Sequence, residues 1–266
     1  LLVQKSNGAA LYATSDLATI LYREEHWHPD RVIYCVGAEQ QFYFSQLFAM
    51  AKKLGITTEL VHVWFGTIDQ ISEEGTREKM SSRKGVVLME ELLDAAEEKA
   101  RLVVGGRDVS QSDVEKITLG AIKFTDFVAD RRTNILFDWD SIFALTGYSG
   151  PYVQYAAVRV NKLLSDANVQ PKEFEASYDY ASEKSVLMKL QEYPSVIQLS
   201  ARDLEPHKIA SYLYLLAREM NRYYETTRVI DEAADVQAAR LGVLAKVAQV
   251  FEHGLNILGI EVPTKM

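Results

Sequence analysis

Two short apolar runs near the start of the chain have the pattern of β-strands. Residues 31–36 and 59–65 are rich in β-branched and aromatic side chains. Between them, the apolar positions of 42–53 repeat with helical spacing, and Gly55 stands where such a helix would end. A strand, a helix and a second strand within about 35 residues predict a βαβ unit with parallel strands.

From about residue 90 onwards the apolar positions repeat with the period of helices. The expected helices are 90–103, 111–130, 151–166, 183–201, 206–225 and 232–258. The last of them carries one apolar stripe, made of Leu241, Leu244, Val247, Phe251, Leu255 and Leu258. Pro151 follows a cluster of turn residues and can occupy the first position of a helix. We therefore expect an α/β domain over 1–149 and an all-α helical bundle over 150–266.

Composition and charge restrict the class of protein. The chain is 48% hydrophobic and 25% charged, which is typical of a globular protein. No apolar run approaches the ~20 residues that cross a bilayer, and the N-terminus lacks the apolar region of a signal peptide, so we expect a cytoplasmic protein without membrane contact. The net charge of −8 argues against indiscriminate binding to nucleic acid, so a nucleic-acid site must be a local patch. Cys35 lies in an apolar run and is expected to be a buried small hydrophobe.

Two polar groups lie in the first half of the chain. In a helix, Tyr12 and Asp16 project to one side, where a phenol and a carboxylate can converge on a cation. The alternative is that Asp16 caps the N-terminus of a helix. Residues 37–41 end the first strand and begin the next helix, which is where ligands bind in open parallel sheets. Turn formation alone explains Gly37 and Glu39 equally well.

A cluster of cations and hydroxyls follows the second strand in a polar loop. Such groups can bind phosphate oxygens as negative charge develops on them, although a solvated loop has the same composition. The candidates are Lys79, Met80, Ser81, Ser82, Arg83 and Lys84.

Aromatic and basic residues also cluster in the helical half. Tyr148, Tyr152 and Tyr155 form either a hydrophobic corner between domains or stacking surfaces for unpaired bases, and Arg159 and Lys162 follow them. In a later helix, Arg218 and Arg222 precede Tyr223 and Tyr224. Cations mixed with aromatics are typical of an RNA patch, but a solvated helix face has a similar pattern.

These blocks, in this order, resemble the arginyl-tRNA synthetases, which are class I aminoacyl-tRNA synthetases. The resemblance covers essentially the whole chain and implies use of ATP with Mg²⁺ to activate L-arginine, followed by transfer to an arginine-specific tRNA. It implies a monomer with no tightly bound cofactor and no metal centre. The matching stretches are GAALYATSDLA, VGAEQQFYFSQLF, KMSSRKG, GPYVQYAAVR and GLNILGIEVPTKM.

The resemblance also implies roles for single residues in adenylate formation. Tyr12, Asp16 and Gln40 match positions that hold the arginine substrate, whose guanidinium pairs with a carboxylate. Lys79 matches the first lysine of the KMSKS signature, the catalytic residue that stabilises the ATP phosphates. Ser82 stands at the second lysine of that signature.

Arg83 or Lys84 supplies the charge that is missing at the second lysine, and the choice between them is open. Tyr43 stands where many relatives carry histidine, so its part in the nucleotide site is open as well. The resemblance places Tyr152, Tyr155, Tyr224 and Met266 near the anticodon loop of the tRNA.

The second signature of class I synthetases, His-x-Gly-His, does not occur in this sequence. His26 and His28 are no substitute, because they precede Pro29 at the expected end of a helix, and two histidines do not make a metal site. We therefore expect a fragment that lacks the first half of the catalytic fold and does not activate arginine alone. The alternative is a non-catalytic tRNA-binding module. A different ATP-using nucleotidyl transferase would not explain the helical half.

Overall fold

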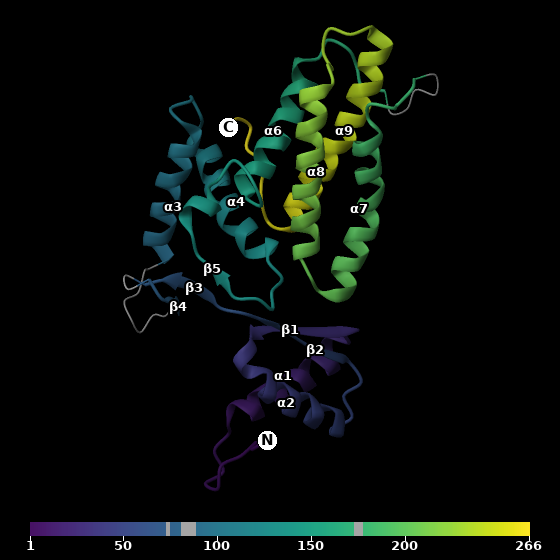
Figure 1. The fold of residues 1–266 in the computed structure, drawn as a ribbon. Coiled ribbons are helices and arrows are strands. Elements are labelled where there is room, and N and C mark those ends of the chain that lie inside the picture. The colour runs from purple at the N-terminus through teal and green to yellow at the C-terminus, as the bar shows by residue number, and fades with distance from the viewer. Residues whose placement is uncertain (73–74, 81–88, 173–177) are drawn as a thin grey trace. The chain divides into compact units, whose positions relative to one another are not determined.

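The computed structural model describes residues 1–72, 75–80, 89–172 and 178–266 (Figure 1). Contacts between residues divide the chain into two compact units. One contains residues 1–68 with 131–135, and the other contains 69–130 with 136–266. These units are defined by contacts between residues and not by domains, so the domain boundary expected at residue 150 stays a prediction.

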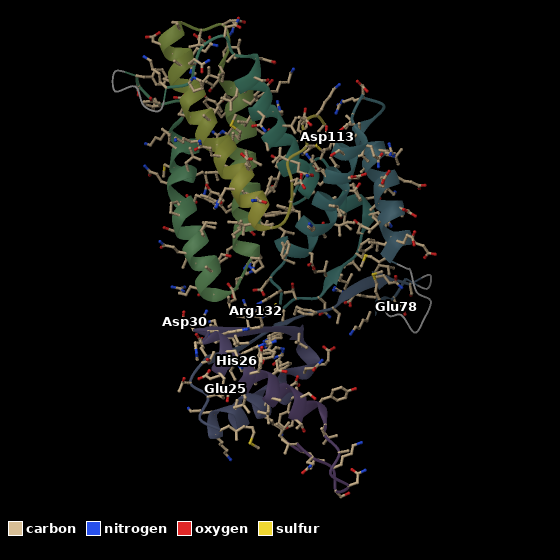
Figure 2. All side chains as sticks on the ribbon, turned by 180° about the vertical axis from the view of Figure 1, so that it is seen from behind. Glu25, His26, Asp30, Glu78, Asp113 and Arg132 are labelled. Carbon is tan, nitrogen blue, oxygen red and sulfur yellow. The ribbon has the colours of Figure 1, made fainter. Side chains whose placement is uncertain are left out.

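The first unit contains the predicted βαβ arrangement, which is confirmed. Strands β1 and β2 pair in parallel, with Val32 opposite Leu60, and α1 and α2 pack through a small apolar cluster that includes Leu17 and Leu47. The elements are α1 (Tyr12–Trp27), β1 (Arg31–Gly37), the 3₁₀ turn η1 (Ala38–Gln40), α2 (Gln41–Lys53) and β2 (Glu59–Phe65). Helix α1 ends just before Pro29, as expected, and Figure 2 labels His26 and Asp30 on either side of the turn that follows.

Cys35 is exposed, so the expectation that it is a buried hydrophobe was wrong. The reason is the alternation of side chains along β1. Tyr34 and Val36 pack against the apolar cluster formed with α1 and α2, and Cys35 faces the opposite side of the strand together with Ile33. An apolar run in the sequence does not distinguish these two faces.

The six predicted helices of the second half of the chain are all present, with ends within two residues of those expected. They are α3 (Met89–Val104), α4 (Gln111–Val128), α6 (Gly150–Asp166), α7 (Lys184–Asp203), α8 (His207–Thr226) and α9 (Ala234–Ile257). The pattern did not predict the short elements β3 (Ile68–Ile71), β4 (Arg77–Lys79), β5 (Ile135–Leu136) and α5 (Trp139–Ile142). The three strands form a sheet in the order β4-β3-β5, and elements of two to four residues are too short for a recognisable period.

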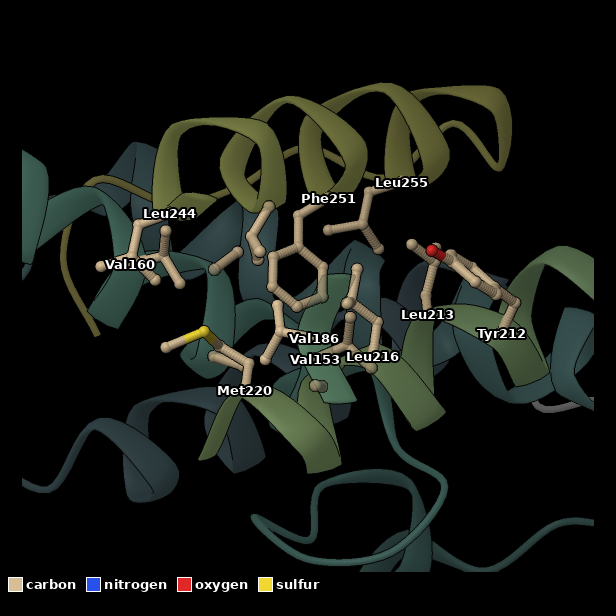
Figure 3. Packing of buried hydrophobic residues seen from close by; sticks show 14 of the residues in the cluster. Val153, Val160, Val186, Tyr212, Leu213, Leu216, Met220, Leu244, Phe251 and Leu255 are labelled. Atoms are coloured by element: carbon tan, nitrogen blue, oxygen red, sulfur yellow. The ribbon is translucent and has the colours of Figure 1, made fainter. Parts of the chain in front are cut away.

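The bundle of α6 to α9 encloses the larger apolar core (Figure 3). All six residues of the predicted α9 stripe are buried. Phe251 and Leu255 of α9 lie against Leu213 and Leu216 of α8, and Val153 of α6 closes the core from another side. The helical half therefore has a continuous core, to which Phe124 of α4 also contributes.

Ser149 is the N-cap residue of α6, the first helix of the bundle. Its hydroxyl oxygen accepts the Tyr152 N–H at 3.2 Å and its O–H donates to the Ala144 carbonyl, all in a buried position. Ser149→Ala should lower the free energy of unfolding by about 1–2 kcal/mol, because a helix cap is lost and a buried carbonyl loses its donor. The matched control is Ser165→Ala in the exposed last turn of α6, expected to change it by less than about 0.5 kcal/mol. Urea unfolding of both variants measures the difference, and equal effects would contradict the role of Ser149.

Candidate functional site

Asp16 lies in the second turn of α1, on the same side as Tyr12. The helix begins at Tyr12 after Leu11, so the alternative in which Asp16 caps the helix was wrong. Tyr12 is 88% exposed, whereas Asp16 is half-buried. A phenol and a carboxylate four residues apart on a helix therefore border the same stretch of surface.

Tyr43 of α2 fixes the carboxylate of Asp16. Its phenol donates a hydrogen bond to Oδ2 of Asp16. Burial raises the pKa of the Tyr43 phenol, and the hydrogen bond to Asp16 raises it further. The phenol therefore stays protonated and acts as a neutral donor. A carboxylate offers roughly four acceptor positions, so Asp16 can still receive the two N–H groups of a planar cation.

Gln40 stands at the start of α2, three residues before Tyr43, with an exposed side chain. The chain reaches this position from the C-terminal end of β1 through η1, which is where open parallel sheets bind ligands. The sequence did not reveal the link from Tyr43 to Asp16. Its one signal was the position of Tyr43 near the start of the predicted helix, three residues after Gln40.

Lys79, expected in a polar loop, is instead the last residue of β4. It is exposed and stands opposite Asp69 of β3 in the antiparallel pair. Asp69 is buried and binds Nε of Arg77 at 2.8 Å, so the base of this strand is held by an ion pair. Met80 directly follows the strand, and the candidates Ser81, Ser82, Arg83 and Lys84 lie outside the described residues.

A cation between two aromatic rings lies on the helical bundle. The guanidinium of Arg159 on α6 is 3.9 Å from the ring centroid of Tyr224 and 5.4 Å from that of Tyr155. Its Nη1 donates to Oδ1 of Asn221 at 3.0 Å. Tyr224 is 40% exposed, and Met266 belongs to the apolar cluster against which Tyr155 packs. We call Tyr155, Arg159 and Tyr224 the sandwich surface. It contains two of the four positions expected near the anticodon loop, and Met266, a third, lies in the cluster against which Tyr155 packs.

Tyr152, the fourth position, belongs to a separate group of rings. Its centroid is 5.6 Å from that of Tyr214 on α8, and Tyr214 in turn stacks on Tyr148 at 3.8 Å. Tyr152 also packs against the bundle core. This group has the form of the hydrophobic corner considered above, while Tyr148 keeps an exposed face.

Over the described part of the chain, no three His, Cys, Asp or Glu side chains are arranged to hold a metal ion. His26 stacks on Tyr22 with ring centroids 4.1 Å apart. Among the same described residues, no helix combines the length and the apolar character needed to cross a membrane.

Family models match both parts of the chain. Residues 1–139 match "tRNA synthetases class I (R), catalytic domain", and residues 153–266 match "DALR anticodon binding domain". The chain belongs to the class I arginyl-tRNA synthetase family. The resemblance read from the sequence, and the expected α/β part followed by a helical anticodon-binding part, are confirmed.

Curated relatives within the arginyl-tRNA synthetase family are named arginine–tRNA ligase. One from Exiguobacterium sp. is 39% identical over the whole chain, and one from Streptococcus pneumoniae is 34% identical. The chain spans 47% of the length of each.

Solved structures of this family share the fold. Arginyl-tRNA synthetase from Thermus thermophilus superposes on the whole chain with a TM-score of 0.85 at 23% identity, and the match covers 51% of that chain. The enzyme from Plasmodium falciparum covers 99% of this chain with a TM-score of 0.81 at 21% identity, and 46% of its own length is matched.

Proposed function

We propose that this chain is the part of an arginine–tRNA ligase that holds the arginine side chain, the ATP phosphates and the anticodon end of the tRNA. The observation that carries the proposal is the Asp16 carboxylate on α1, which is held by Tyr43 of α2, three residues after Gln40 at the junction of β1 and α2. A pre-positioned carboxylate is the group that recognises a guanidinium in two places at once.

In the proposed reaction, the arginine carboxylate attacks the α-phosphorus of ATP, and arginyl adenylate and pyrophosphate form. Asp16, Tyr12 and Gln40 bind the arginine side chain and orient it. Lys79, at the end of β4, carries the positive charge that stabilises the phosphates as the bond to pyrophosphate breaks. Mg²⁺ enters with ATP as part of the substrate.

The second step transfers the arginyl group to the terminal adenosine of the tRNA, and the helical bundle supplies the binding surface. The sandwich surface combines an exposed ring with a cation, which suits unpaired bases and their phosphates. The net charge of −8 favours such a local patch over general binding across the surface.

Binding of labelled arginine tRNA to this chain tests the proposal. We expect arginine tRNA to bind more tightly than a tRNA for another amino acid, and both to bind more weakly at roughly 200 mM than at 50 mM salt. Equal affinity for the two tRNAs at both salt concentrations would contradict recognition of the anticodon.

Arg159→Ala should weaken binding of arginine tRNA by roughly 5- to 20-fold, because both tyrosine rings lose the cation that orients them. Arg202→Ala, which removes an equal charge from an exposed position on α7, is the matched control and should change affinity by less than about twofold. Equal losses in the two variants would mean that Arg159 acts only through total charge.

A further inference from the structure

The segment 258–266 that follows α9 lies against α4 and is held by α4 side chains. Lys123 donates to the Gly259 carbonyl at 2.5 Å, and Lys116 forms an ion pair with Glu261 at 3.5 Å. Asp113 lies one turn before Lys116, and Figure 2 labels it beside this segment. Positions 113, 116 and 123 fall on one face of α4, so the segment runs along this face.

Gln154 of α6 holds the same segment from a second helix. Its Nε2 donates to the Glu261 carbonyl at 2.8 Å and to the Lys116 carbonyl at 2.9 Å. The amide lies against Gly120 of α4, where an added Cβ would meet it at 2.4 Å. Close approach of α4 and α6 at this glycine therefore brings the segment within reach of both helices.

Asp113 holds the segment through a buried carboxylate. It is 3% exposed. Its Oδ1 accepts the Thr264 N–H at 2.7 Å, and both of its oxygens lie 3.0 Å from the Thr264 hydroxyl. Burial raises the pKa of the Asp113 carboxyl, but the hydrogen bonds from Thr264 and Ser110 outweigh it and hold the pKa below its usual value. A buried carboxylate without these donors is costly, so the pair holds Thr264 in one place.

Met266 follows Thr264 by two residues and is 7% exposed. It belongs to the apolar cluster of α3, α4 and α5, and Tyr155 packs on that cluster from α6. Tyr155 is in turn the inner ring of the sandwich surface. A path of direct contacts and shared packing thus leads from Asp113 through Thr264 and Met266 to Tyr155.

We propose that Asp113 is a positioning residue for tRNA binding: by holding Thr264 it keeps Met266 in the cluster on which Tyr155 packs, and so orders the sandwich surface before tRNA arrives. The inference rests on the proposed function of that surface. It also gives α4 a part in tRNA binding, although this helix lies outside the region that matches the anticodon-binding domain. Helix α4 lies within the catalytic-domain match, and the segment that it holds lies within the anticodon-binding match.

The test measures binding of labelled arginine tRNA to this chain with Asp113→Ala and Asp113→Asn. Asp113→Ala should weaken binding by about tenfold, as loss of an ordered contact residue does. Asp113→Asn should restore binding to within about threefold, because the amide can accept the Thr264 N–H and donate to its hydroxyl. The matched control is Asp108→Ala, which removes the same charge from an exposed loop position before α4 and should leave binding unchanged.

Hydrogen exchange on the same variants separates positioning from a general loss of stability. In Asp113→Ala, amides of 260–266 should exchange faster while those of α6 and α9 remain protected. Combining Asp113→Ala with Met266→Ala should weaken binding no more than the stronger single change, because both act on one path. Additive losses would overturn the inference.

The inference and the proposed function fail in different ways. If 260–266 loosens in Asp113→Ala but tRNA binding stays unchanged while Arg159→Ala still weakens it, the inference is wrong and the proposed function stands. If Asp113→Ala does not fold, Thr264→Val is the second variant, because it removes only the hydroxyl at an exposed residue. It should weaken binding by about threefold, and unchanged binding would overturn the inference. A wild-type chain that binds no tRNA would overturn both.

Discussion

Replacing Lys79 by alanine in a full-length synthetase with these residues should lower kcat for adenylate formation by about 10²–10³-fold. The proposed role of the ammonium is to meet negative charge that builds up on the phosphates only as the bond to pyrophosphate breaks. An interaction of this kind contributes more to the transition state than to bound ATP. Lys79 lies at the exposed end of β4, and its partner across the strand pair, the buried Asp69, binds Arg77 of the same strand.

Steady-state ATP–pyrophosphate exchange with arginine and tRNA measures this effect. Lys79→Arg should retain part of the rate because it keeps the charge, and Lys52→Ala in the exposed last turn of α2 is the control for loss of charge elsewhere. A change confined to the KM for ATP would show that Lys79 only binds the ground state.

Replacing Asp16 by asparagine in the same full-length enzyme should weaken arginine binding by roughly 2–4 kcal/mol, the scale on which a desolvated charge pair is lost. Asparagine keeps one acceptor and nearly the same shape. It loses the charge and the second acceptor oxygen, so a guanidinium can no longer bind in two places. The hydrogen bond from Tyr43 holds the side chain in place, so the loss would report on recognition and not on reorientation.

Arginine titration followed by calorimetry compares Asp16→Asn with Asp30→Asn, which makes the same change at an exposed position after α1. Unchanged affinity in Asp16→Asn would leave Asp16 as a structural partner of Tyr43. An equal loss in both variants would indicate a long-range effect of charge alone.

The local order of residues was sufficient to predict the regular elements of this protein. The strands of the βαβ unit follow from short runs of β-branched and aromatic residues, and the six long helices and the buried stripe of α9 follow from a period of 3.6 residues, because both signals depend only on neighbours along the chain. The ordered blocks around Asp16, Gln40, Lys79 and Tyr155 were likewise sufficient to indicate the family, since each is a contiguous run.

Only the tertiary structure decided how these elements meet. Asp16 and Tyr43 are 27 residues apart and Asp113 and Thr264 are 151 apart, and no local period brings such pairs together. Their contacts depend on how the helices pack. The exposure of Cys35 has the same cause, because a strand in isolation has two equal faces and the helices packed against one of them decide which is buried.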